Sequence, residues 1–288
     1  MRQKTALSPR RRVYDLAARG LLYCSAFLTC ALLVSIIGYI CFKGIPGISW
    51  QFLTTQESVL RGTVGILPAI RNTLFVIFLS LVIALPLGVG AAIYLTEYAR
   101  NRRLVSVIEF ATETLAGIPS IIYALVGVII FCTALGLEKT LVAGSLTLVI
   151  MTLPTIIRTT QESLKTVPQS YREGSLGLGS GKWHMIRTVV LPSSVDGIVT
   201  GCILAVGRVV GESAVLMYTA GLSTAMQDFS SISEIMKSSG ATLTVALYVY
   251  AKENANFAVA FSIATILLGI TVLINLAASL AGKKLKRG

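Results

Sequence analysis

The sequence predicts an all-α membrane protein with six transmembrane helices, and three observations support this. Hydrophobic residues make up 54% of the 288 residues, charged residues only 13%, and the mean hydropathy is +0.78. A soluble protein would carry about a quarter charged residues, so this chain has too little charge for a water-facing surface. Six apolar stretches are near the ~20 residues that a helix needs to cross a bilayer. Because backbone groups in lipid must be hydrogen-bonded internally, these stretches are predicted to be helices.

The predicted spans alternate with connections whose basic residues indicate the orientation. The first span is too long for a signal-peptide core and lacks an A-x-A-like cleavage site, so it is expected to be retained. An even number of spans puts both termini on one side. The termini and the second-to-third and fourth-to-fifth connections hold 18 Lys and Arg, against six in the other connections, which predicts that this side is cytoplasmic. The spans are Leu21–Phe42, Thr73–Tyr94, Ala116–Ala134, Leu141–Ile157, Ile198–Met217 and Ala255–Ala281.

Several function classes lose support from the composition and the motifs. The net charge of +12 is explained by basic residues that set the orientation in the membrane, so no nucleic-acid partner is predicted. The stretch LGLGSGKW, which begins at Leu176, resembles a phosphate loop but lacks the first glycine and the Ser or Thr after Lys182. No catalytic constellation, metal-ligand spacing or cofactor motif is recognised, and His184 lies apart from the cysteines. The chain is therefore predicted not to be an enzyme, and any nucleotide hydrolysis is expected on another subunit.

The connection between the fourth and fifth spans is longer than a turn requires, so it is expected to carry structure of its own. An amphipathic interfacial helix would explain the length alone. Its residues, however, match a spaced pattern at every position: Glu173, Gly174, Ser175, Gly179, Val189, Leu191 and Pro192. This pattern resembles the "EAA" loop of type I ABC importer permeases, which have a MetI-like core. The resemblance implies that residues of about 161–192 form a cytoplasmic coupling helix that docks in a cleft of an ATPase subunit.

Physical reasons support the residue types in that loop. Small residues at Gly174 and Ser175 let a short helix approach a partner closely, and Glu173 offers a charge to a basic group. Gly179 permits a turn with positive φ.

The predicted fifth span contains two charged residues, Arg208 and Glu212, which are four residues apart and so share one helix face. Charges in a membrane need partners, so mutual pairing is the first expectation. The pair is either a static ion pair or part of a transport path. Gly197 and Gly201 lie on the same face and predict close approach of another helix, while Gly207 and Gly211 form a second G-x-x-x-G on a neighbouring face. The fifth span is therefore predicted to be an interior helix.

Three further segments resemble one branch of the permease family, the phosphate importers of the PstA type: GILPAIRNTL at residues 65–74, ETLAGIPSIIYALVG at 113–127 and GRVVGESAVLMYTAG at 207–221. Val215 stands where many members carry Pro, so no kink is predicted there. The resemblance implies import of inorganic phosphate, with Arg208 as transient anion partner and Glu212 as its counter-ion. Ser120 and Tyr123 are added as hydroxyl donors beside a helix break at Pro119. A hydrogen bond of Ser120 within its own helix, and anchoring of Tyr123 at the membrane interface, are alternatives of at least equal weight.

The same resemblance implies the partners and the domain organisation. The expected partners are a homologous PstC-type permease, a dimer of PstB-type ATP-binding subunits, an extracytoplasmic PstS-type phosphate-binding protein, phosphate and membrane lipid. Residues 1–20 and 283–288 are predicted as basic cytoplasmic tails, 21–64 as the first span with its extracytoplasmic loop, and 65–282 as the type-1 permease domain. Two alternatives stay open: the same fold with another oxyanion, sulfate or molybdate, as cargo, or a membrane-embedded enzyme or signalling partner.

Overall fold

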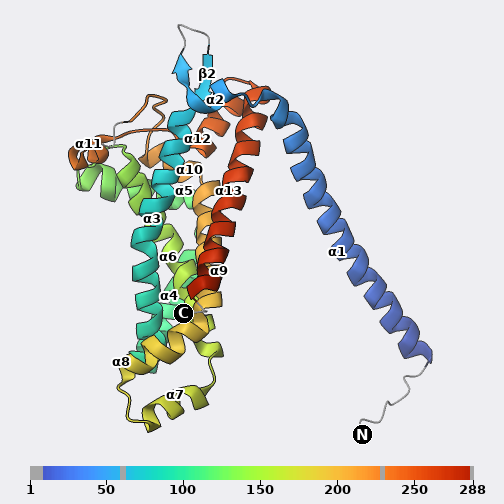
Figure 1. Ribbon diagram of the computed structural model, residues 1–288, viewed down its shortest axis with the longest axis vertical. Helices are drawn as coiled ribbons and strands as arrows, with labels where there is room; N and C mark the ends of the chain where they lie inside the picture. Colours follow the sequence, from blue (N-terminus) through green and yellow to red (C-terminus); the bar gives the residue numbers. More distant parts are fainter. Residues whose placement is uncertain (1–8, 59–62, 228–230, 286–288) are drawn as a thin grey trace.

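The computed structural model describes residues 9–58, 63–227 and 231–285, and this part of the chain is mostly helical (Figure 1). Five helices are long and apolar enough to cross a membrane, and a bent pair of helices makes a sixth candidate span. With the bent pair counted as one span, the prediction of six is confirmed. The spans are α1 (Pro9–Gly44), α3 (Leu67–Ile93), α4 (Arg102–Ala116) with α5 (Ser120–Gly127), α6 (Leu141–Thr166), α9 (Leu191–Gly211) and α13 (Phe257–Leu285).

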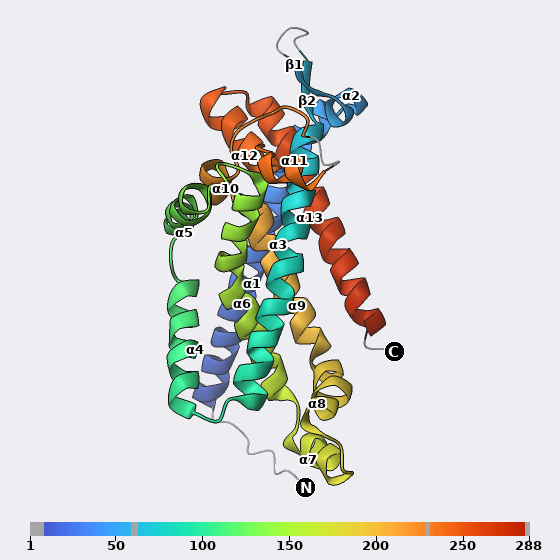
Figure 2. The same ribbon diagram turned by 90° about the vertical axis from the view of Figure 1, so that its left-hand side faces the viewer.

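Shorter elements gather at the two ends of the bundle (Figures 1 and 2). One end carries an antiparallel hairpin of β1 and β2, in which Gln56 lies opposite Ile66, and we call it the hairpin end. The other carries α7 and α8, and we call it the loop end; α1 begins and α13 ends toward it. These elements are η1 (Ile45–Gly47), α2 (Trp50–Thr54), β1 (Gln56–Ser58), β2 (Thr63–Ile66), η2 (Tyr94–Tyr98), η3 (Val128–Ala134), α7 (Gln169–Gly177), α8 (Lys182–Met185), η4 (Ile186–Val190), α10 (Ala214–Thr219), α11 (Ile232–Lys237), α12 (Leu243–Tyr248) and η5 (Val249–Glu253).

The centre of the bundle is formed by α3, α6 and α9, which pack against one another. Their buried side chains form one apolar cluster, which includes Val76 from α3, Met151 from α6 and Val206 from α9. Ser80 of α3 also donates a hydrogen bond to the backbone carbonyl of Ser145 in α6, at 3.3 Å. In lipid, such close packing and interhelical hydrogen bonds hold helices together, because the tails are as apolar as the side chains.

Two glycines explain how closely α9 lies against α6. A β-carbon at Gly197 would overlap the side chain of Ser163, and one at Gly201 would overlap Thr159. The prediction that this glycine face accommodates another helix is therefore confirmed. The second pair, Gly207 and Gly211, is exposed and has no neighbouring atoms where its β-carbons would lie.

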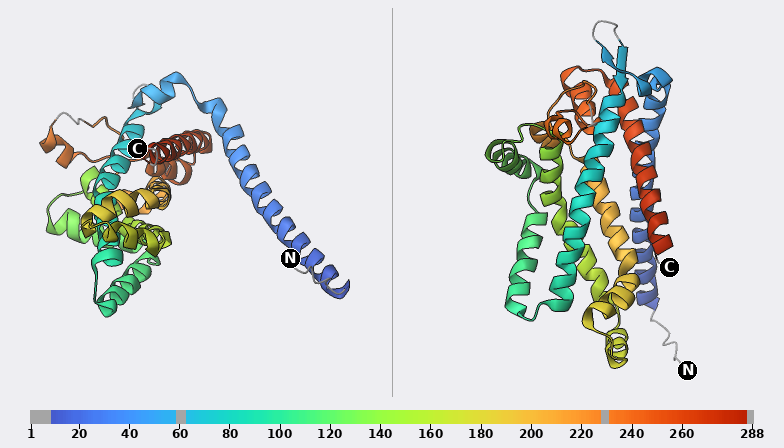
Figure 3. Two further views of the ribbon diagram at one scale, coloured as in Figure 1. Left: turned by 60° about the horizontal axis from the view of Figure 1, so that its bottom comes forward. Right: turned by 60° about the vertical axis from the view of Figure 1, so that its left-hand side comes forward.

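Helix α1 diverges from the bundle and meets it only near the hairpin end (Figures 1 and 3). There, Tyr39 packs edge-to-face on Phe261 of α13 with ring centroids 5.7 Å apart. Ser262 of α13 donates a hydrogen bond of 3.0 Å to the carbonyl of Gly44. The most apolar part of α1 has a mean hydropathy of 2.2, yet none of it is buried. This helix therefore presents an apolar surface to its surroundings.

Several predicted boundaries differ from those observed. Helix α6 continues past the predicted end at Ile157 to Thr166, because the polar residues that follow Ile157 still form helix. Helix α1 begins at Pro9, so residues 9–20 of the predicted basic tail are helical. Helix α13 likewise includes Lys283 and Lys284. The remaining parts of the two predicted tails, 1–8 and 286–288, lie outside the described residues.

Two predicted spans are broken rather than continuous. The third, expected over Ala116–Ala134, is the second arm of a pair bent by 101° between Ala116 and Ser120. The predicted helix break at Pro119 is confirmed, since this residue precedes α5 and has extended backbone angles. The fifth span ends at Gly211 and resumes at Ala214, although it was predicted to continue to Met217.

Candidate functional site

The segment between α6 and α9 folds into two short helices joined by a glycine turn. Helix α7 ends at Gly177, and Gly179 adopts a φ of +84°. The predicted positive φ at this glycine is confirmed, and it is a region that other residues enter at a cost. Helix α8 then leads through η4 directly into α9, so residues Lys182–Gly211 form one uninterrupted helical rod.

The residues predicted for coupling divide into an exposed set and a supporting set. Glu173 and Gly174 are exposed on α7, and a β-carbon at Gly174 would meet no other atom. Ser175 is half-buried, with its hydroxyl oxygen 2.7 Å from that of Ser180 across the turn. Leu191 is half-buried at the start of α9 and is followed by the exposed Pro192. The loop therefore presents Glu173 and Gly174 outward, together with Leu178, which is 92% exposed.

An arginine that sequence reasoning did not single out lies beneath this surface. Arg172 pairs with Glu97 of η2, with 2.9 Å between Nη2 and Oε1. Its guanidinium also donates to the carbonyls of Leu164, at 2.8 Å, and Val167, at 2.6 Å. The sequence alone does not identify Arg172 as important, because its partner Glu97 is distant in the sequence.

A small apolar cluster supports the same region. Ile93 from α3, Leu164 from α6 and Ile186 from η4 are among its buried members. Beside it, the ammonium of Lys182 in α8 lies 4.9 Å from the ring centroid of Tyr98, a cation–π contact. The loop is thus packed against the ends of α3 and α6 rather than suspended from them.

The second group of predicted residues lies where α9 breaks. Arg208 and Glu212 are both half-buried. Among the described residues five ion pairs form, and the predicted pair between Arg208 and Glu212 is not one of them. Because the helix ends at Gly211, Glu212 turns away from the α9 axis and its Oε1 accepts the N–H of Val215, at 3.1 Å. The prediction of a counter-ion on the same helix face is wrong for this arrangement. Glu212 instead caps α10, and Arg208 has no carboxylate partner within the described part of the chain.

The two hydroxyl residues from the third span lie in α5, which packs against α10. Tyr123 is buried and close enough to Arg208 for the phenol and the guanidinium to interact electrostatically. Its hydroxyl donates a 2.7 Å hydrogen bond to the carbonyl of Leu115, in the last turn of α4. Tyr123 therefore ties the two arms of the bent pair together. Ser120 is half-buried at the start of α5, and its hydroxyl makes no hydrogen bond to any described residue.

The segment that closes this junction was not predicted as helix. Helix α12 packs on α13 and α3, and Thr244 donates a hydrogen bond to the carbonyl of Val210 near the end of α9. The apolar run TLTVALYVYA, which starts at Thr242, is shorter than a membrane span, and runs of this length are typical of core or re-entrant helices. That length is the signal that would have identified α12.

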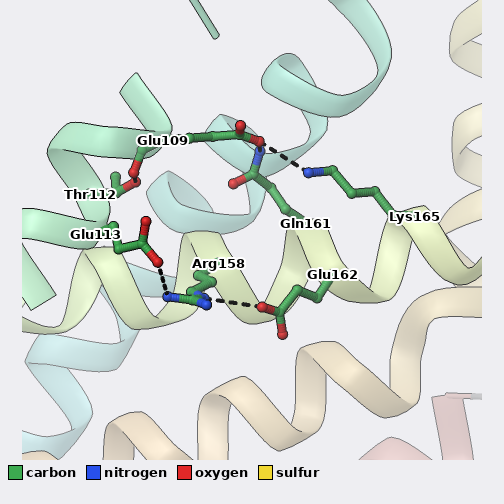
Figure 4. Close-up of a pocket in the computed structure, with 7 residues that line it drawn as sticks. All are labelled: Glu109, Thr112, Glu113, Arg158, Gln161, Glu162 and Lys165. Atoms are coloured by element: carbon green, nitrogen blue, oxygen red, sulfur yellow. Dashed lines mark hydrogen bonds and ion pairs between the residues drawn. The ribbon is translucent and has the colours of Figure 1, made fainter. Parts of the chain in front are cut away.

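A charged cavity of about 210 Å³ lies between α4 and α6 (Figure 4). Arg158 pairs with Glu113 of α4 at 3.0 Å and with Glu162 of its own helix at 3.1 Å. Lys165 pairs with Glu109 of α4, also at 3.0 Å. All five of these side chains are 39–67% exposed. No residue of α4 is buried, and its exposed ion pairs with α6 are each expected to contribute little to stability.

Six candidate spans, two of them broken, a half-buried arginine near the second break and an exposed helical loop at one end are typical of a membrane-transport subunit. Residues 84–287 match the family described as "Binding-protein-dependent transport system inner membrane component", and the chain belongs to this family of multi-pass plasma-membrane proteins. Its relatives are transporter permease subunits and not enzymes. The resemblance to PstA-type permeases is thereby confirmed.

Curated relatives and solved structures agree with this assignment. The "Probable ABC transporter permease protein YqgI" of Bacillus subtilis (strain 168) is 36% identical over 220 residues, which are 76% of this chain and 75% of that protein. The "Phosphate transport system permease protein PstA 1" of Mycobacterium tuberculosis (strain CDC 1551 / Oshkosh) is 31% identical, covering 95% of this chain and 90% of that protein. In fold, the chain is similar to a subunit of a bacterial ABC transporter involved in alginate import, with a TM-score of 0.65 over 95% of this chain and 99% of that one, at 17% identity. The MetNI methionine ABC transporter gives 0.57 over 77% and 94%, at 21% identity. The predicted MetI-like permease fold is confirmed.

Proposed function

We propose that this chain is a membrane-spanning subunit of an ATP-driven importer that moves inorganic phosphate into the cytoplasm. The observation that carries the proposal is Arg208, a half-buried arginine that no carboxylate of the described residues neutralises. A charged group inside the membrane region is costly without a partner, so such residues mark ion paths. Guanidinium is the side-chain group best suited to a tetrahedral oxyanion, because its donors form a fixed fork. The names of the PstA relatives favour phosphate as that oxyanion.

The helix breaks around Arg208 support a path at this point. Discontinuous helices expose backbone groups, which membrane proteins tolerate where the backbone lines a cavity or is buried in protein. Arg208 is the anion partner in this proposal. Glu212 holds the α9 break beside it, and Ser120 and Tyr123 line the neighbouring arm. Ser120 has its hydroxyl available, whereas Tyr123 would have to release Leu115 to reach an anion.

The exposed loop residues are the proposed contact with an ATPase subunit. Glu173 and Gly174 face outward, and Ser175 and Gly179 form the turn. Leu191 and Pro192 begin α9 within the rod that leads into the membrane. The proposed complex contains a PstC-type permease, two PstB-type ATPase subunits and a PstS-type phosphate-binding protein. One chain of six spans is too small to enclose the path, and the open Gly207–Gly211 face is a candidate contact for the second permease.

The proposed function implies an orientation of the chain in the membrane and a division into domains. The loop end, which carries most of the basic residues, lies in the cytoplasm of a prokaryote, with both tails, 1–20 and 283–288. The hairpin end, including part of residues 21–64, faces the binding protein, and residues 65–282 form the permease domain. An importer of the same fold for sulfate or molybdate is the alternative.

The test measures ATP-dependent phosphate uptake in membrane vesicles that contain the chain with its co-purifying subunits. Arg208→Ala is expected to abolish uptake while the complex still assembles, and Glu173→Lys to release the ATPase subunit. Arg208→Lys is the matched control, since it keeps the charge and loses the fork. Full uptake by a correctly inserted Arg208→Ala variant would refute the path assigned to this residue.

A further inference from the structure

Arg172 and Glu173 are neighbours in α7, but their side chains face opposite ways. Glu173 is exposed on the outer surface of the loop. The side chain of Arg172 is only 12% exposed, and that of its partner Glu97 only 6%. The other four ion pairs of the described residues have side chains that are 39–67% exposed. The Arg172–Glu97 pair is therefore the desolvated ion pair among them.

This one guanidinium joins three segments. Nε and Nη2 donate to Glu97 at the end of α3, at 3.1 and 2.9 Å. Nη1 donates to Val167 and Nη2 to Leu164, whose carbonyls lie at the end of α6. The last carbonyls of a helix lack their usual partner four residues on; that of Leu164 accepts the N–H of Val167 at 3.3 Å, and the guanidinium is its second and closer donor. Separating the members of a buried pair would leave each charged and desolvated. Because this is costly, the connection between the segments resists opening.

A second contact attaches the loop at the adjacent residue. Lys182 of α8 lies over the ring of Tyr98, one position after Glu97. Both loop helices are thus fixed to the same end of α3. At their other halves, α3 and α6 contribute Val76 and Met151 to the apolar cluster that also contains Tyr123 of α5.

We infer that Arg172 is a positioning residue that makes α7 move as one body with α3 and α6. The inference rests on the proposed function, in which an ATPase subunit moves the loop. Movement of α7 is then delivered to the two helices that pack around the helix breaks. The competing route is the uninterrupted rod from α8 through η4 into α9, which would transmit movement without Arg172.

The first experiment uses the complete reconstituted complex and measures phosphate imported per ATP hydrolysed. Arg172→Ala and Glu97→Ala are each expected to retain the bound ATPase subunit and basal hydrolysis, and to lower that ratio by about tenfold or more. The double variant is expected to be no worse than either single variant, because the two residues act as one unit. Arg19→Ala, which removes an exposed ion pair in α1, is the matched control and is expected to leave the ratio unchanged. An unchanged ratio in Arg172→Ala with the ATPase bound would overturn the inference in favour of the rod.

Two further variants guard against misfolding as the explanation. Arg172→Lys keeps the charge but has a single nitrogen for three acceptors, so an intermediate ratio is expected. Glu97→Cys with Arg172→Cys, in a background without the native cysteines, is expected to regain the ratio when a short bifunctional thiol reagent joins the two sites. Failure of the cross-link to restore any coupling in an assembled complex would contradict a mechanical role.

Hydrogen exchange tests the role of Arg172 independently of the substrate that the complex imports. In the wild-type complex, ATP is expected to change amide protection in both α7 and α3, and in Arg172→Ala only in α7. If the wild-type complex imports no phosphate but Arg172→Ala still loses the α3 response to ATP, the proposed cargo is refuted and the inference stands. An α3 response that persists in Arg172→Ala would overturn the inference whatever the cargo is.

Discussion

The turn at Gly179 gives the sharpest prediction about the proposed contact with the ATPase subunit. Its φ of +84° lies in the left-handed region, and a β-carbon there meets no other atom, so the cost of a side chain is conformational rather than steric. That cost is about 1–2 kcal/mol for a non-glycine residue. If the loop relaxes to avoid it, the docking-competent turn is depopulated by about 5- to 30-fold, and the apparent affinity for the ATPase subunit falls by the same factor. Gly179→Ala is therefore expected to raise the Kd of the purified permease complex for its ATPase subunit by that amount.

Gly177→Ala is the matched control for this measurement. Gly177 is the last residue of α7, is exposed, and has open space around its β-carbon position without a positive φ. Alanine is favoured over glycine in a helix, so this variant is expected to bind the ATPase subunit as the wild type does. Equal Kd values for the two alanine variants would refute the reasoning, because only the backbone angle distinguishes the two sites.

Three other predictions concern the bundle. Gly201→Leu overpacks the α6–α9 contact and is expected to cost about 1–3 kcal/mol of stability, seen as a lower melting temperature of the detergent-solubilised chain. Gly207→Leu is expected to leave that temperature unchanged. Equal losses in the two variants would contradict the assigned packing. Tyr123→Phe leaves the carbonyl of Leu115 without its 2.7 Å hydrogen bond and is expected to increase amide exchange in the last turn of α4; unchanged exchange would show that the bond does not hold the arms together. Arg158→Ala removes only exposed ion pairs and is expected to leave the melting temperature unchanged at high and low salt, so a salt-dependent loss would contradict the minor role given to them.

The parts of the fold that local sequence determines were predictable. Apolar runs of membrane length identified the spans, Pro119 identified a break, and Gly179 identified a positive φ, because each effect arises within a few residues. The face formed by Gly197 and Gly201 was equally readable from helical periodicity.

The parts that depend on distant segments were not predictable. No proline marks the break at Glu212, and the carboxylate of this residue accepts the N–H of Val215 in α10 instead of pairing with Arg208. The importance of Arg172 depends on Glu97 and on the end of α6, which only the folded chain brings together. A bend of 101° also exceeds what Pro119 alone implies, since Tyr123 and the packing of α5 on α10 help to hold it.

The most direct test of the central claim is uptake of radiolabelled phosphate by vesicles that contain the purified complex, its binding protein and internal ATP. Uptake is expected to require hydrolysable ATP. Excess unlabelled phosphate is expected to suppress it, and sulfate and molybdate are expected not to. Vesicles that take up sulfate or molybdate but not phosphate would contradict the assigned cargo, and phosphate uptake without ATP would contradict the coupling assigned to the loop.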